Sequence, residues 1–223
     1  MKTLICVVLD ESGSMGAKKR DVIGGFNTFL ADQQKLTDPC RLMMTKFNTK
    51  CWTMVDPTAI GDVKALTDDT YTPGGNTALL DAVAQTIKIA EAQKGFDERC
   101  LVLVVTDGEE NSSHETTKDQ VVALTKAKEA LGDWTFTYLG VALDQWLKDM
   151  RYHAGNVKAY NVNAPAQSFG AMSKATANLR GSNLTADSNF YGRTDAPEPA
   201  GHTRAASVPT PDNPDSARRV GNG

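Results

Sequence analysis

Two uninterrupted apolar runs constrain the fold of this chain more than any other feature. They cover residues 4–9 (LICVVL) and residues 100–105 (CLVLVV), and neither is interrupted by a polar residue. A short continuous run of this kind is typical of a strand that is covered on both faces. Because such strands occur in parallel sheets with helices packed on either side, the two runs predict an α/β fold.

Amphipathic helical patterns alternate with the predicted strands. Apolar residues at helical spacing predict helices at residues 17–35, 77–93, 121–131, 143–150 and 169–179. Besides the two apolar runs, strands are predicted at residues 41–47, 51–55, 134–141 and 157–162, the first two as a hairpin. This alternation predicts a doubly wound, mostly parallel, six-stranded sheet of Rossmann-like type, with one antiparallel edge strand and helices on both faces.

Length and composition indicate one folded domain followed by a tail. The chain has 223 residues, of which 40% are hydrophobic and 23% charged, as is typical of a globular protein. Residues 181–223 hold five of the nine prolines and few large apolar side chains. Too little apolar surface is present there to offset the entropy of ordering the chain. We therefore predict a domain over residues 1–180 and a flexible tail over residues 181–223, with Phe190 and Tyr191 as its one candidate anchor.

Charge and cysteine content argue against several classes of protein. The formal net charge of −3, from 24 basic and 27 acidic residues, is unlike that of a general nucleic-acid binder. The four cysteines are widely spaced without a CxxC pair, which favours reduced thiols over a metal cluster or a disulfide framework. No apolar stretch approaches the length of a membrane span, and residues 1–10 do not resemble a signal peptide. We therefore expect a cytoplasmic protein without membrane contact.

Residues with oxygen donors follow both apolar runs. Residues 10–16 (DESGSMG) follow the first run, residues 106–111 (TDGEEN) follow the second, and a glycine-rich loop at residues 72–77 (TPGGNT) opens a predicted helix. Carboxyl ends of parallel strands meet at one edge of such a sheet, where ligands bind. Carboxylate and hydroxyl oxygens suit Mg²⁺, Mn²⁺ or Ca²⁺ better than Zn²⁺. The sequence therefore predicts a divalent-cation site that keeps one position open for a further anionic ligand.

Each candidate residue also has a simpler role when it is taken alone. Ser12 and Ser14 could cap a turn or a helix, and Thr77 could begin its helix behind Asn76. The Asp-Gly pair at residues 107–108 is a common turn pair. These simpler roles would have to coincide at the ends of two buried strands and in one glycine-rich loop, so the combination favours a site.

The combination resembles a known motif. Asp10-x-Ser12-x-Ser14, Thr77 in GGNTALLDA and Asp107 in VVTDG are similar to the metal-ion-dependent adhesion site of von Willebrand factor A domains, and the resemblance covers about residues 1–180. It implies that the serines and the threonine or second aspartate touch the metal directly or through water. It also implies that Asp10 acts largely through water and that a partner's Glu or Asp supplies the sixth ligand.

The resemblance further implies binding, assembly or scaffolding without enzymatic activity, in an intracellular standalone member of bacterial or phage type. The favoured hypothesis is a module that docks a partner protein's carboxylate onto Mg²⁺ or Mn²⁺, and an AAA-type ATPase or another complex subunit is a candidate partner. One alternative is a Mg²⁺-dependent phosphotransfer enzyme resembling haloacid-dehalogenase phosphatases, with Asp10 as nucleophile. Ser12 weakens it, because those enzymes carry a second aspartate at that position. Another alternative is a structural component with a vestigial site.

Several charged residues lie close to the motif in the sequence. Five of them would surround the metal with acid and select a partner with a basic surface, although solubility explains them equally well. They are Glu11, Asp68, Asp69, Glu109 and Glu110. The basic residues 18–20 are interpreted as the solvated start of the first helix, and His114 as a solvated loop residue rather than a metal ligand.

Overall fold

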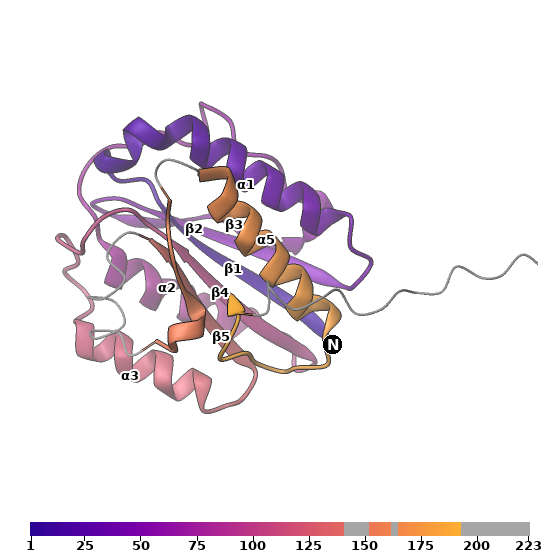
Figure 1. The fold of residues 1–223 in the computed structure, drawn as a ribbon. Helices are drawn as coiled ribbons and strands as arrows, with labels where there is room; N and C mark the ends of the chain where they lie inside the picture. Colours follow the sequence, from indigo (N-terminus) through magenta and orange to yellow (C-terminus); the bar gives the residue numbers. More distant parts are fainter. Residues whose placement is uncertain (141–151, 162–164, 193–223) are drawn as a thin grey trace, which may run out of the picture.

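A six-stranded sheet forms the centre of the fold (Figure 1). The structure is a computed structural model that describes residues 1–140, 152–161 and 165–192. The strands are β1 (Lys2–Asp10), β2 (Cys40–Phe47), β3 (Cys51–Ala59), β4 (Glu98–Val105), β5 (Trp134–Gly140) and β6 (Val157–Ala159). They lie in the order β3-β2-β1-β4-β5-β6, and each neighbouring pair is parallel except β2 with β3. The predicted mostly parallel sheet with one antiparallel edge strand is confirmed.

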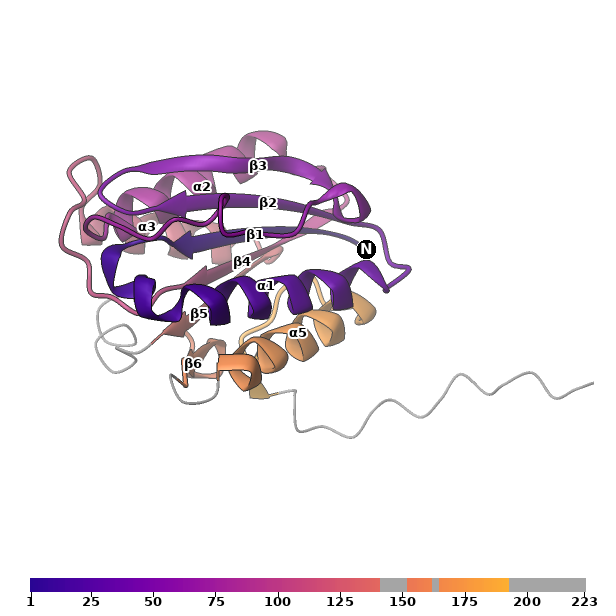
Figure 2. The same ribbon diagram turned by 90° about the horizontal axis from the view of Figure 1, so that it is seen from above.

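Helices cover both faces of this sheet. On one face lie α1 (Lys19–Gln34) and α5 (Pro165–Gly181), and on the other lie α2 (Leu79–Gln93) and α3 (Lys118–Glu129), as Figure 2 shows. Short 3-10 helices within the described residues include η1 (Gly13–Lys18), η2 (Ile60–Asp62) and η3 (Ala154–Asn156). The helix predicted at residues 143–150 lies outside the described residues. Among the described helices, none combines the length and hydropathy that crossing a membrane requires.

Strand β1 supplies apolar side chains to both cores. Successive residues of a strand point to opposite faces, so a strand between two helical layers must be apolar throughout. Residues 4–9 are accordingly no more than 1% exposed. The side chains of Ile5, Val7 and Leu9 face α1 and α5, and those of Leu4, Cys6 and Val8 face α2 and α3. All four cysteines of the chain are free thiols.

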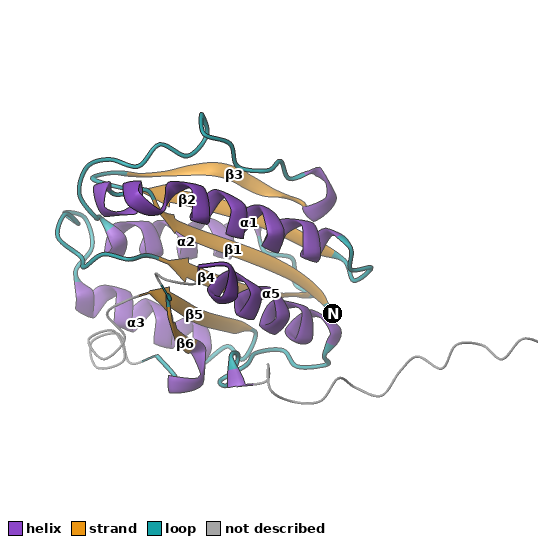
Figure 3. Cartoon of the chain, turned by 45° about the horizontal axis from the view of Figure 1, so that its top comes forward, coloured by secondary structure: helices purple, strands orange, loops and turns teal. Residues whose placement is uncertain are grey.

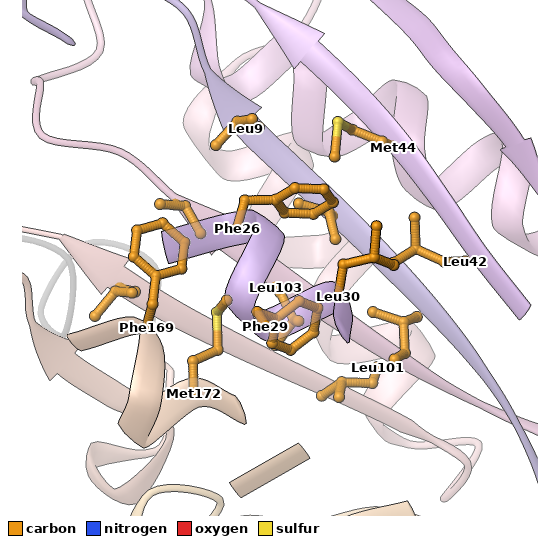
Figure 4. Packing of buried hydrophobic residues seen from close by; sticks show 14 of the residues in the cluster. Leu9, Phe26, Phe29, Leu30, Leu42, Met44, Leu101, Leu103, Phe169 and Met172 are labelled. Carbon is orange, nitrogen blue, oxygen red and sulfur yellow. The ribbon is translucent and has the colours of Figure 1, made fainter. Parts of the chain in front are cut away.

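Helices α1 and α5 approach each other closely at a glycine. A Cβ atom on Gly25 would lie 2.1 Å from Cδ2 of Phe169, so the absence of a side chain leaves room for that ring. Figure 4 shows Phe169 and Met172 of α5 beside Phe26 and Phe29 of α1, all within one buried cluster. The pairing of these two helices therefore covers the face of the sheet that carries Ile5, Val7 and Leu9.

Two buried arginines close the amino end of the sheet. Arg99 of β4 donates to the carbonyl oxygens of Arg180 at 2.8 Å and Leu184 at 2.5 Å. Arg180 in turn donates to the carbonyl oxygens of Gln33 at 2.7 Å and Asp38 at 2.7 Å. Helix C-termini carry unpaired carbonyls and favour cations, so these guanidinium groups cap α5 and α1. They attach the C-terminal ends of both helices to the amino ends of the strands, which lie opposite the candidate site.

The segment after α5 packs against the domain. We predict a tail from residue 181 onward, but residues 182–192 are placed on the body of the fold. Phe190 and Tyr191 are 1% and 6% exposed, which confirms them as an anchor. The Phe190 N–H donates to Asn156 Oδ1 at 2.9 Å, and the Tyr191 N–H donates to the Gly155 carbonyl at 2.8 Å. The packed region therefore reaches at least Gly192. The rings of Phe190 and Tyr191 bury apolar surface that the low apolar content of residues 181–223 does not reveal.

Candidate metal centre

The carboxyl ends of β1 and β4 lie at the end of the sheet away from the N-terminus (Figure 3), and the five residues of the predicted site lie at the end of β1, in the segments that follow these strands, and before α2. Asp10 is the last residue of β1, and Asp107 follows the end of β4 by two positions. Leu9 and Val105 are register partners, so the two strand ends lie side by side. Strand β2 pairs with one side of β1, and β4 pairs with its other side. The strand order therefore reverses at β1, which makes the carboxyl ends of β1 and β4 a topological switch point.

A chain of hydrogen bonds runs from Asp10 through the two serines to Asp107. Ser12 Oγ lies 3.1 Å from Ser14 Oγ, and Ser14 Oγ donates to Asp107 Oδ1 at 2.6 Å. The Ser12 backbone N–H donates to Asp10 Oδ1 at 2.7 Å. Although Ser12 immediately precedes η1, its hydroxyl makes no capping hydrogen bond to that helix. The hydroxyl of Ser12 is therefore directed to the cluster rather than to helix capping.

Thr77 reaches the same cluster at a space beside Gly108. A Cβ atom on Gly108 would lie 3.2 Å from Thr77 Oγ1, 3.6 Å from Ser14 Oγ and 3.7 Å from Asp10 Oδ2. Oxygens of Asp10, Ser14 and Thr77 thus converge closely on Gly108, where a glycine without a side chain allows the approach. Thr77 does not cap the following helix, because α2 begins at Leu79 behind Ala78. The structure therefore brings all five predicted residues together.

The donor set fits a hard divalent cation. Two carboxylates and three hydroxyls are oxygen ligands, which suit Mg²⁺, Mn²⁺ or Ca²⁺. Within the described residues, no group of three or more His, Cys, Asp or Glu side chains could hold a metal ion. A cation at this edge would consequently depend on the hydroxyls of Ser12, Ser14 and Thr77 as much as on the carboxylates.

Asp10 is a fully buried carboxyl group. Its Oδ1 accepts from the Ser12 N–H, and its Oδ2 accepts from the Thr106 hydroxyl at 2.5 Å. Burial raises the pKa of Asp10, the hydrogen bonds from Thr106 and Ser12 lower it, and the nearby charge of Asp107 raises it again, with a net rise. A cation beside Asp10 would favour the charged form of its carboxyl group. The electrostatics of the site therefore favour a bound positive charge.

A lysine ammonium already lies against the second aspartate. Lys18 Nζ donates to Asp107 Oδ2, and the two side chains are only 20% and 2% exposed. The interpretation of Lys18 as part of a solvated helix start is therefore wrong. The residue ends η1 and turns its side chain inward, where a carboxylate replaces its hydration. In the sequence, only its position four residues after Ser14 connects Lys18 with the candidate site.

Three residues that the sequence analysis did not identify hold the site in place. The Tyr71 hydroxyl donates to the Asp10 carbonyl at 2.6 Å, and Thr106 binds the Asp10 carboxylate. Asn111 binds the backbone of Thr77 through two hydrogen bonds. No local pattern marks these residues, because each role depends on loops that meet only in the folded chain.

The predicted ring of acid around the metal is only partly present. Glu11 is 1% exposed and accepts from Lys46 Nζ at 2.8 Å. Glu110 accepts from the Leu80 N–H at 3.0 Å and so binds the first turn of α2. Both carboxylates therefore make internal contacts instead of facing a partner. The exposed acidic residues of the five are Asp68, Asp69 and Glu109.

The loop that contains His114 is fixed by a buried carboxylate. Asp81 of α2 accepts from the backbone N–H groups of His114 at 2.9 Å and Thr116 at 2.7 Å. His114 itself is exposed, as expected for a solvated loop residue. The loops around the site are thus attached to the start of α2 by Glu110 and Asp81.

The doubly wound sheet resembles the von Willebrand factor A class of α/β domain. The family model for the von Willebrand factor type A domain matches residues 5–110, a range that contains all five candidate site residues. The sequence match and the fold together support this family. A search of curated protein sequences finds no significant match.

Solved structures share the fold at low sequence identity. The chain is similar to a von Willebrand factor type A protein from Catenulispora acidiphila, with a TM-score of 0.54 and 19% identity over 77% of this chain and 42% of the other. It is similar to the vWF domain of the type V pili tip protein Mfa5 from Porphyromonas gingivalis, with a TM-score of 0.58 and 10% identity over 80% and 95% of the two chains.

A third similar structure is the pilus adhesin SpaC from Lactobacillus rhamnosus GG. Its TM-score is 0.63 at 14% identity, over 82% of this chain and 31% of the adhesin. The chain thus spans less than half the length of both the Catenulispora protein and SpaC. At these identities the likeness establishes the fold and leaves the ligand to be argued from this chain's own residues.

Proposed function

We propose that this chain is a protein-binding module that depends on a divalent cation, Mg²⁺ or Mn²⁺. The cation ligands would come from Asp10, Ser12, Ser14, Thr77 and Asp107, with a partner's carboxylate completing the coordination. The observation that carries this proposal is the convergence of oxygens of Asp10, Ser14 and Thr77 within 4 Å of the position that a Cβ atom on Gly108 would take. When bound, the ion would supply a positive centre that an oxygen ligand can coordinate.

The composition of the site supports a cation that still attracts an anion. Three of its five side chains are neutral hydroxyls, so the protein would not over-neutralise a divalent charge. Gly13, Ser14, Gly75 and Asn76 are exposed at this edge of the sheet, which leaves the site accessible to another protein. The hydrogen bonds among Ser12, Ser14 and the aspartates hold the donors close together before any ion binds. Donors held in this way favour binding because little ordering is required.

The proposed partner is a protein that presents a Glu or Asp side chain within a basic surface. Domains of this family often serve interaction and adhesion, and the similar SpaC structure is described as a pilus adhesin. Exposed acid at Asp68, Asp69 and Glu109 would complement a basic surface around the docked carboxylate. A subunit of a cytoplasmic complex, such as an AAA-type ATPase, is the candidate that the family resemblance suggests.

A non-catalytic role fits the surroundings of Asp10 better than phosphotransfer does. A nucleophilic carboxylate must reach its substrate, whereas Asp10 is 0% exposed and both its oxygens accept hydrogen bonds. Ser12 also replaces the acid/base aspartate that such a mechanism needs. Assay of the purified protein with p-nitrophenyl phosphate and Mg²⁺ checks this directly, because turnover that is lost in Asp10→Ala would favour the enzyme.

Calorimetric titration of the purified protein with MgCl₂ and MnCl₂ tests the site itself. We expect saturable binding to the wild-type protein and loss of binding in Asp10→Ala and Ser14→Ala. Ser188→Ala, at an exposed serine outside the site, serves as the control and should bind like the wild type. Absence of binding to the wild-type protein would overturn the proposal.

Partner capture tests the docking role. Immobilised protein should retain a protein from cells of its own source when Mg²⁺ is present and release it on addition of EDTA. The same retention should be absent in Asp10→Ala and Ser14→Ala. A partner that stays bound in EDTA and in both variants would favour a structural component with a vestigial site.

A further inference from the structure

We propose that the Lys18 ammonium group competes with the divalent cation for the Asp107 carboxylate. The affinity of the site for metal is therefore lower than it would be without this lysine. This inference rests on the proposed function, because it concerns the same cation site. It concerns one contact, between Lys18 Nζ and Asp107 Oδ2.

Both oxygens of Asp107 already have partners. Oδ1 accepts from Ser14 at 2.6 Å, and Oδ2 accepts from Lys18. The Asp107 side chain is 2% exposed, so water contributes little to stabilising its charge. A cation that draws on Asp107 therefore replaces or weakens an existing ion pair instead of meeting a hydrated carboxylate.

The position of Lys18 in the chain is otherwise unfavourable. It directly precedes α1, and the N-terminus of a helix carries partial positive charge that disfavours a cation. Its side chain is 20% exposed, so most of its hydration is also lost. Asp107 compensates for both effects. The ion pair is thus the feature that accounts for a lysine turned inward at this place.

The neighbouring lysine shows that the contact is specific. Lys19 Nζ donates to the Asp68 carbonyl at 2.8 Å and lies 3.4 Å from its carboxylate, which is largely exposed. Lys46, which is buried at the same end of the sheet, binds Glu11. Of the two successive lysines at residues 18 and 19, only Lys18 lies against a residue of the candidate site.

Competition has a defined thermodynamic consequence. A ligand that binds one of two states shifts the equilibrium toward that state, and the shift is reciprocal. If metal binding opposes the ion pair, loss of the Lys18 ammonium must strengthen metal binding. A charge-assisted hydrogen bond of this kind changes an affinity by about tenfold.

Titration of Lys18→Met with MgCl₂ tests the competition, with Lys19→Met as the matched control. We expect Lys18→Met to bind Mg²⁺ about tenfold more tightly than the wild-type protein, as for loss of one charge-assisted hydrogen bond. Lys19→Met removes the same charge from the adjacent position and should change the affinity less than about twofold, because surface charges are well screened. Lys18→Gln, which keeps a polar side chain, provides a second variant in case the Met variant folds poorly.

Thermal unfolding gives an independent readout. In the absence of metal, Lys18→Met should melt at a lower temperature than the wild-type protein, because Asp107 loses its counter-charge. Saturating Mg²⁺ should remove most of this difference, since the bound ion replaces the ammonium. A difference that is equal with and without Mg²⁺ would contradict competition.

The outcomes separate the two proposals. Wild-type binding of Mg²⁺ together with equal or weaker binding in both Lys18 variants overturns the competition and leaves the metal site intact. Tighter binding of Mg²⁺ by Lys18→Met than by the wild-type protein, with Lys19→Met unchanged, supports the competition. No binding of Mg²⁺ or Mn²⁺ to any of the proteins overturns the proposed function, and the competition is overturned with it.

Discussion

Asn111 binds the backbone of Thr77 through two hydrogen bonds, one with its side chain and one with its own backbone. The Thr77 N–H donates to Asn111 Oδ1 at 2.9 Å, and the Asn111 N–H donates to the Thr77 carbonyl at 3.1 Å. Asn111 belongs to the loop after β4, and Thr77 belongs to the loop before α2. Two of the three loops that form the candidate site are thus joined without a metal. Asn111 therefore fixes the backbone from which the Thr77 hydroxyl extends.

Asn111→Ala should weaken Mg²⁺ binding about fivefold, because the free loop must be ordered when the ion binds. The same change should lower the free energy of unfolding by about 1 kcal/mol through the lost hydrogen bond. Calorimetric titration and urea denaturation measure the two effects. Asn76→Ala alters an exposed neighbour of Thr77 and should leave both values near those of the wild type. Unchanged Mg²⁺ affinity in Asn111→Ala would show that other contacts place Thr77.

The sequence predicts the sheet and the position of the site for one physical reason. Residues 4–9 and 100–105 are apolar throughout because both faces of β1 and β4 are covered, and this burial leaves no local alternative to a central strand. Once two parallel strands are fixed, Asp10 and Asp107 must emerge at the same edge. The apolar pattern of the two strands and the topology of the sheet are therefore sufficient to predict where Asp10 and Asp107 lie.

Features that depend on which side chains meet were not predictable in this way. Glu11 and Glu109 look alike in the sequence, because each is a glutamate shortly after an apolar run. In the structure, however, Glu11 is buried against Lys46, which lies 35 residues away. Lys18 resembles Lys19 in sequence, but only one of them turns toward Asp107. Pairing of charges across elements depends on side-chain direction, which the pattern of apolar residues does not encode.

Glu109→Lys should slow association with a captured partner about tenfold at low salt, because an exposed negative charge beside the site becomes positive. The effect should shrink as ionic strength rises, since screening weakens interactions between exposed charges. Association rates at two salt concentrations provide the measurement. Asp62→Lys reverses an exposed charge in η2, which follows β3 at the opposite edge, and is the control. An unchanged rate at low salt would remove the role of acid in partner choice.

Arg99→Met should lower the free energy of unfolding by about 3 kcal/mol, because several buried carbonyl oxygens lose their donor together. Arg99 is 0% exposed and binds the carbonyls of Arg180 and Leu184, so no water replaces it. Urea denaturation measures the loss. Arg20→Met, at an exposed arginine of α1, should change stability by less than about 0.5 kcal/mol. A loss in Arg99→Met as small as that of the control would mean that the helix ends do not need this cap.

The ion pair between Arg41 and Glu98 predicts a pH dependence of stability. Burial favours a higher pKa for Glu98, but hydrogen bonds from the Arg41 guanidinium and the Gly95 N–H outweigh it and hold the pKa below the ordinary 4.5. A carboxyl group with a lowered pKa stabilises the fold above its unfolded-state pKa, and this stabilisation is lost as pH falls through the folded-state pKa. Glu98→Gln should therefore be less stable than the wild type at neutral pH.

The difference between Glu98→Gln and the wild type should shrink progressively below pH 4.5, as the wild-type carboxylate is protonated. Urea denaturation of both proteins across this range gives the result. Asp62→Asn, at an exposed carboxylate, should run parallel to the wild type. A constant difference between Glu98→Gln and the wild type would assign the effect to packing instead of charge.

Gly108→Ala should abolish Mg²⁺ binding while the protein stays folded. The added Cβ would lie 3.2 Å from Thr77 Oγ1 and would occupy the point on which the Asp10, Ser14 and Thr77 oxygens converge. Gly108 does not have a positive φ, so alanine fits the backbone and the loss would come from the filled space. Gly16→Ala adds the same methyl group where no atom lies within 4 Å and is the matched control. Calorimetric titration together with thermal unfolding of both variants separates loss of the site from loss of the fold. Normal Mg²⁺ affinity in Gly108→Ala would place the ion away from this point and would contradict the geometry on which the metal site is argued.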